Sequence, residues 1–172
     1  MNLEGKIVGE RIFLREIVES DLSERFILWL SDPDVNEFLE VRHNPPNLET
    51  QKQYVKECRL SPSKVYLGIF QQNETLIGSV TLNSHETRVE IGLMIGDKSL
   101  QGRGIGTEVV KTVSHWARAQ GFTEITAGYL QENKRSARLF ESLGFQIVRV
   151  IPKSDTIRQD HSVVKTSLSL KA

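Results

Sequence analysis

The 172-residue sequence holds one cysteine, five prolines and no excess of either charge, and two of these shortages exclude classes of protein. Cys58 has no second cysteine for an internal disulfide, and no base-bearing motif that would activate a thiol surrounds it. Lysine and arginine together number 22, as do aspartate and glutamate. Without a net positive charge, the chain is not expected to bind nucleic acid or an anionic membrane.

Long apolar runs and metal-binding patterns are also missing. The N-terminal residues lack the basic, apolar and small-residue order of a signal peptide, and no apolar run could cross a bilayer, so we expect a cytoplasmic protein with no membrane partner. The four histidines are too scattered for the spacing of zinc ligands, so we expect no metal. What remains is 38% hydrophobic and 26% charged residues, the composition of a soluble globular protein.

No repeat, low-complexity segment or linker divides the chain, so residues 1–172 are predicted to form one domain. Apolar periodicity predicts a sheet and four helices. The strands are expected over 6–15, 65–70, 75–82, 88–95, 123–129, 145–151 and 162–170, and the helices after Asp21 and over 48–60, 104–120 and 134–143. This order predicts an α+β fold with a single mixed, mostly antiparallel sheet of about seven strands flanked by four helices.

Capping residues predict where two of these helices begin. Asp21 and Glu24 have the spacing of a capping box at the start of the first helix. Asn47 is a favoured N-cap directly before the helix over 48–60.

The most informative segment follows a predicted strand and opens a predicted helix. Its glycines, Gly102, Gly104 and Gly106, let the backbone approach a ligand closely, and free amides at a helix N-terminus attract a phosphate. The spacing differs from the dinucleotide fingerprint and the Walker lysine is missing, so neither NAD nor a P-loop is favoured. Taken alone, such a turn is more often a tight connection than a binding site.

The surroundings of this turn favour a binding site. The pattern Gln101-x-x-Gly104-x-Gly106 after the strand that carries Glu90 resembles the acetyl-CoA motif of the GNAT superfamily of N-acetyltransferases. The superfamily's second hallmark follows downstream, as Asn133-x-x-Ser136-x-x-Leu-Phe-Glu-Ser-Leu-Gly-Phe. The segments 11–15 and 29–33 are similar to the Rim-type branch, named for acetylation of ribosomal protein N-termini. The resemblance covers nearly the whole chain.

The resemblance implies a GNAT fold in which the fourth and fifth strands splay apart, with acetyl-CoA as cosubstrate and no metal. The fourth strand would pair with the pantetheine arm, and the glycine turn would hold the pyrophosphate. The cofactor-binding residues so implied are Leu93, Met94, Ile95, Gln101, Gly102, Arg103, Gly104, Ile105, Gly106, Thr107, Asn133 and Phe140. The sequence also explains Asn133 as the N-cap of the helix that follows it.

Acetyl transfer requires a neutral amine, and a lysine-like group with a pKa near 10.4 is only about one part in two thousand neutral at pH 7. Relatives use a carboxylate at the matching strand position as general base, so the resemblance implies this role for Glu90, directly or through a water. From the residues alone, Glu90 is a polar side chain on the wetter face of the sheet.

When the amine attacks, the coenzyme A thiolate leaves and can take up a proton, for which the sequence offers more than one donor. Many superfamily members have a tyrosine where this chain has Phe140, which carries no such proton. The Rim-type resemblance implies Ser136 instead, and Tyr129 at the end of the preceding strand is a second candidate. A thiol with a pKa of about 8.5 is also a good leaving group without a dedicated acid.

The acceptor is left open between two classes of amine. A peptide N-terminus or a small-molecule amine is ranked first. The run from Glu37 to Arg42 resembles a segment of relatives that acetylate amino-sugar nucleotides, in which Arg42 would bind a phosphate bidentately. A non-catalytic acyl-CoA sensor would be expected to have lost Glu90 or the glycine turn, and both are present. The sequence leaves a homodimer open.

Overall fold

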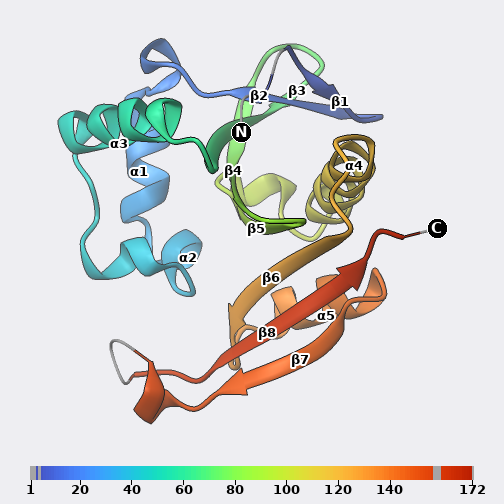
Figure 1. Ribbon diagram of the computed structural model, residues 1–172. Helices are drawn as coiled ribbons and strands as arrows, with labels where there is room; N and C mark the ends of the chain where they lie inside the picture. The colour runs from blue at the N-terminus through green and yellow to red at the C-terminus, as the bar shows by residue number, and fades with distance from the viewer. Residues whose placement is uncertain (1–2, 4, 157–159, 172) are drawn as a thin grey trace.

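The computed structural model describes residues 3, 5–156 and 160–171. Figure 1 shows one open sheet with helices on both faces. The strands follow the order β1-β2-β3-β4-β5-β6-β8-β7 across the sheet. Their bounds are β1 Ile7–Val8, β2 Ile12–Glu16, β3 Lys64–Gln71, β4 Leu76–His85, β5 Arg88–Ile95, β6 Glu124–Leu130, β7 Gln146–Ile151 and β8 Val163–Ser169. The predicted α+β class with one mixed sheet is confirmed.

The helices are α1 Glu24–Ser31, α2 Pro33–Asn36, α3 Leu48–Leu60, α4 Ile105–Ala119 and α5 Lys134–Ser142. The predicted start of α3 is confirmed, because the Asn47 side chain accepts a hydrogen bond from the amide of Thr50. The sequence prediction missed α2, a single turn that begins at Pro33 with the Asp32 side chain as its N-cap. Proline favours the first position of a helix because it has no amide hydrogen to leave unpaired.

Two further predictions were wrong in detail. The first predicted strand is a hairpin of two, because the chain turns at Gly9, whose amide donates to Ile12 O at 2.8 Å; this gives eight strands instead of about seven. Asp21 does not cap α1, since Ser23 accepts the hydrogen bond from Phe26 N. The Asp21 carboxylate instead accepts hydrogen bonds from Arg15 at 2.7 Å to each oxygen and from Val18 N at 2.8 Å.

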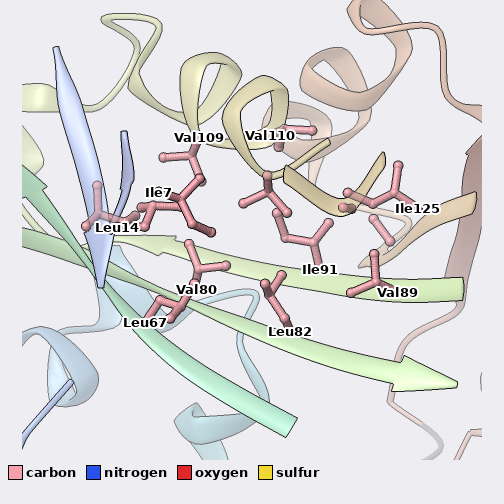
Figure 2. Close-up of a cluster of buried hydrophobic side chains, with 14 of the residues drawn as sticks. Ile7, Leu14, Leu67, Val80, Leu82, Val89, Ile91, Val109, Val110 and Ile125 are labelled. Carbon is pink, nitrogen blue, oxygen red and sulfur yellow. The ribbon is translucent and has the colours of Figure 1, made fainter. Parts of the chain in front are cut away.

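Alternating side chains build a separate apolar core on each face of the sheet. On the α4 face, Val89 and Ile91 of β5 pack among aliphatic residues of β2–β4, β6 and α4, as Figure 2 shows. On the opposite face, Met94 of β5 packs with residues of α1, α3 and β3. β5 is thus buried on both sides, and its backbone is fixed relative to helices on both faces.

The parallel pairing between β5 and β6 is the feature that creates the site. It runs over four pairs, from Arg88 with Glu124 to Ile91 with Ala127, and then stops although both strands continue. β5 stays paired to β4 as far as Ile95. The predicted splay between the fourth and fifth main strands is therefore present, and it leaves the last four residues of β5 without a partner on the β6 side.

The outer strand β7 is exposed along most of its length. It pairs with β8, but the register shifts between Ile147 and Arg149, so that Val148 is an extra residue in a bulge. Ile147, Val148 and Val150 are each about half exposed or more. The sheet therefore ends in a bent strand that carries aliphatic side chains.

Truncation of a core side chain is predicted to destabilise the fold strongly. Leu82 of β4 is fully buried in the α4-side core, so Leu82→Ala should lower the free energy of unfolding by about 2–5 kcal/mol. Leu60→Ala is the matched control, because Leu60 is 86% exposed, and it should cost less than about 0.5 kcal/mol. Urea denaturation measures both, and equal losses would contradict the assignment of Leu82 to the core.

Candidate active site

A cleft of about 610 Å³ opens where β5 and β6 separate. One wall consists of the end of β5 and the glycine turn, the second of the start of α5, and the third of α2 with the residues that follow it. Of the predicted cofactor-binding residues, those that line this cleft are Leu93, Met94, Ile95, Gln101, Gly102, Gly104, Gly106, Thr107 and Asn133. The structure thus brings most of the predicted set, from three separate segments, into one cleft.

The glycine turn leaves the N-terminus of α4 without a side-chain cap. Gly102 and Gly104 have φ values of +73° and +79°, a left-handed conformation that costs side-chain-bearing residues energy. Ser23, Asn47 and Asn133 cap α1, α3 and α5, whereas Gly104 gives α4 no such acceptor. The amides of the first turn of α4 therefore need an acceptor from elsewhere, and an anion is the group that they and the helix dipole favour.

Gln101 connects the walls of the cleft. Its side-chain amide donates to Ile95 O at 2.9 Å, and its side-chain oxygen accepts a hydrogen bond from Arg135 of α5. The carbonyl of Ile95 is therefore already in use. Met94 lies opposite Ser79, and the hydrogen bond from Gly96 N to Ile77 O shows that its backbone groups face β4. Of the three predicted backbone partners for a pantetheine arm, Leu93 is therefore the best placed, because its backbone groups face the opening.

Basic residues of α5 were missed by the sequence prediction. Lys134, Arg135 and Arg138 lie in the first two turns of α5 and line the cleft. Asn133 precedes them and accepts a hydrogen bond from Ser136 N at 3.0 Å, so it does act as the N-cap. The signal was available, because residues 134 and 138 share a helix face at the i, i+4 spacing. The cleft thus has amides on one side and cations on the other.

Three predicted cofactor contacts and one catalytic candidate lie outside the lining of the cleft. Phe140 is buried between the rings of Tyr129 and Phe145, with ring centroids 6.0 and 5.0 Å away, because that face of α5 packs on the sheet. Ile105 is buried in the α4-side core. Among the described residues that line the cleft, Ser136 is present and Tyr129 is not. Of the two candidates, Ser136 is therefore the one that lies at the cleft. Arg103, the third predicted contact outside the lining, accepts a hydrogen bond from Arg11 through its carbonyl.

A second cavity of about 700 Å³ lies on the α1/α3 side and meets the cleft at Leu39, Leu93 and Met94, which line both. Its polar lining includes Tyr66, which is buried and hydrogen-bonded by Gln51 at 3.3 Å. Burial raises the pKa of Tyr66 well above its ordinary value, so this hydroxyl stays protonated. The cavity offers mostly uncharged hydrogen-bonding groups beside the end of β5.

Glu90 is held in an ion pair next to the opening. Its carboxylate lies 2.6 Å from Nζ of Lys165, which belongs to β8. The lysine crosses over Gly128 of β6, where a Cβ would lie only 3.0 Å from Nζ. Glu90 is on the same face of β5 as Gly92, which lines the second cavity, but Glu90 itself does not line it.

Arg42 joins two segments of the chain beside the second cavity. Its guanidinium donates to Leu39 O at 2.9 Å and to Asp160 at 2.8 Å, and His43 lies 3.2 Å from the same carboxylate. The arginine therefore fixes the segment between α2 and α3 against the residues that precede β8.

The described residues contain no cluster of three or more histidine, cysteine, aspartate or glutamate side chains that could hold a metal ion. In the same part of the chain, every helix is too short or too polar to span a bilayer.

The sheet order, the splayed strands and the uncapped α4 together define an acetyltransferase fold. Residues 11–146 match the acetyltransferase (GNAT) domain family, and the chain belongs to this family of acyltransferases.

Known relatives are consistent with this assignment. The uncharacterised protein MJ1062 of Methanocaldococcus jannaschii is 32% identical over 146 residues, which are 82% of this chain and 30% of that protein. The uncharacterised N-acetyltransferase YobR of Bacillus subtilis is 21% identical over 120 residues, which are 68% of this chain and 48% of that protein. The chain spans less than half the length of both.

Among solved structures, the fold is similar to that of RimL, a ribosomal L7/L12 α-N-protein acetyltransferase, in complex with coenzyme A. The TM-score is 0.82 with 19% identity, over 96% of this chain and 98% of that one. At this identity the similarity concerns the fold.

Proposed function

We propose that this protein transfers an acetyl group from acetyl-CoA to a primary amine. The observation that carries the proposal is the uncapped, glycine-rich N-terminus of α4, which lines the cleft where β5 and β6 separate. This arrangement suits a long ligand with a phosphate at one end and an amide-bearing arm that adds to a strand. Coenzyme A has both features.

The residues present fit such a cosubstrate. The amides of Gly104 to Thr107 would hold the pyrophosphate, and Lys134 and Arg138 of α5 supply positive charge across the cleft for further phosphate. The backbone of Leu93 would pair with the pantetheine arm in place of β6. Acetyl-CoA supplies an activated acyl group, a thioester with a good leaving thiol.

The second cavity is the proposed acceptor site, because it meets the cofactor cleft at Leu93 and Met94. The amine nitrogen attacks the thioester carbonyl, a C–N bond forms and the C–S bond breaks. The amine must lose a proton, which Glu90 accepts through a water, and the thiolate gains one, for which Ser136 is the donor within the cleft.

We rank a peptide N-terminus or a small-molecule amine first among acceptors. None of the described residues that line the acceptor cavity is a lysine or arginine that could bind a phosphate, so an amine without a phosphate group is favoured over an amino-sugar nucleotide. An α-amino group has a pKa near 7.7–8.0, which leaves a sizeable neutral fraction for a base that acts through water. The fold similarity to RimL supports the same ranking.

A substitution in the glycine turn is predicted to weaken cofactor binding. Gly104→Val adds a side chain at a positive φ and blocks close approach, so the dissociation constant for coenzyme A should rise at least about tenfold, the loss of one charged hydrogen bond or more. Gly121→Val is the control, because Gly121 has a similar φ of +86° at the far end of α4 and equal backbone strain. Calorimetric titration with unchanged affinity in folded Gly104→Val would refute the placement.

Glu90→Gln is predicted to slow acetylation by about 10² to 10⁴, the usual size of a general-base contribution. Glutamine can still accept a hydrogen bond from Lys165, so affinity for coenzyme A should hardly change. The matched control is Glu124→Gln on the adjacent strand, whose carboxylate lies 3.9 Å from Arg88. Steady-state rates from pH 6 to 8 decide the matter: a fully active Glu90→Gln enzyme would mean that solvent removes the proton.

A panel of amines is predicted to show turnover with peptide N-termini or small amines and none with amino-sugar nucleotides. Arg42→Lys should lower the rates on all accepted amines to a similar degree, because Arg42 holds Leu39 and Asp160 in place. Turnover of a sugar nucleotide, lost selectively in Arg42→Lys, would reverse the ranking. Coenzyme A binding without turnover of any amine would instead support an acyl-CoA sensor.

A further inference from the structure

We propose that Lys98 is a positioning residue for the cofactor, because it fixes the α2 wall of the cleft to the segment that leads into the glycine turn. The proposal rests on acetyl-CoA being the ligand of this cleft. Lys98 does not itself line the cleft or the acceptor cavity, so any effect on binding passes through the residues that it holds.

Lys98 makes two ion pairs with the start of α2. Its Nζ lies 2.8 Å from Asp32 and 3.0 Å from Asp34. Asp32 is the N-cap of α2, and Asp34 lies in its first turn and lines the cleft. The hydrogen bond from Lys98 lowers the pKa of Asp32 below its ordinary value, so that carboxylate is ionised at neutral pH. Lys98 therefore connects the start of α2 to the segment that precedes the glycine turn.

A neighbouring contact supports the same connection from α1. Asp97, directly before Lys98, binds Arg25 at 2.6 Å, and the ring of Trp29 packs against Gly96 so closely that a Cβ there would lie 2.2 Å from it. α1 is thus tied to the end of β5 independently of Lys98. The end of α2 is also held, because the buried Asn36 side chain donates to Leu30 O at 2.8 Å. Loss of Lys98 should therefore loosen the start of α2 and leave the fold intact.

The position of α2 matters because the chain runs from it into the junction of the two cavities. Val35 and the residues from Glu37 to Leu39 line the cleft, and Leu39 also lines the acceptor cavity. A shift of α2 would therefore change the width of the cleft along the path proposed for the pantetheine arm. Lys98 is placed to affect cofactor affinity without contact with the cofactor.

Calorimetric titration with coenzyme A tests this assignment. Lys98→Met should raise the dissociation constant about threefold to tenfold, and Lys98→Arg, which keeps the charge and the reach to both carboxylates, should restore it. Lys52→Met is the matched control, since Lys52 pairs only within its own helix, with Glu49. Its affinity and that of the wild type should agree.

The double variant Lys98→Met with Asp34→Asn separates position from charge. If Lys98 only neutralised Asp34, the double variant would regain wild-type affinity, and that result would overturn the proposal. A double variant as weak as Lys98→Met supports it. Wild-type affinity in Lys98→Met alone would also overturn it, while the proposed function would stand; failure of the wild type to bind coenzyme A would instead refute the proposed function.

Discussion

The end of the parallel pairing between β5 and β6 is the constraint on which the rest of the site depends. A strand that loses its neighbour exposes backbone donors and acceptors, which usually costs stability or invites another chain. Here β5 tolerates the loss because it stays paired to β4 and is packed on both faces, through Val89 and Ile91 on one side and Met94 on the other. The unpaired end of β5 is therefore held in place by β4, and its backbone on the open side is available to a ligand.

The N-terminus of α4 likewise leaves backbone groups without a protein partner at the opening. Most helices of this protein complete their first turn with a side chain, as Ser23, Asn47 and Asn133 do. α4 does not, and its unsatisfied amides lie at the same opening as the unpaired end of β5. Two incomplete hydrogen-bonding patterns in one place are better explained by a shared ligand than by two separate defects.

Local patterns in the sequence were enough to predict the main sheet, the helix starting after Asn47 and the glycine turn, because each follows from neighbouring residues. The hairpin at Gly9 was missed because β1 has only two residues, too few for any periodicity to register. The sequence also could not show that Phe140 faces the core or that Lys165 reaches Glu90, since both depend on which strands are neighbours. The pairing of β8 with β6 brings residues 75 positions apart to within 2.6 Å.

The bulge in β7 has a consequence for how the molecule behaves in concentrated solution. An outer strand with exposed Ile147, Val148 and Val150 is the sort of edge on which chains assemble into extended aggregates. The extra residue at Val148 interrupts the regular spacing of hydrogen-bonding groups, and the strand bends there. A flat strand could add to one half of β7 or the other but not along its whole length, so the bulge protects the protein against polymerisation through this edge.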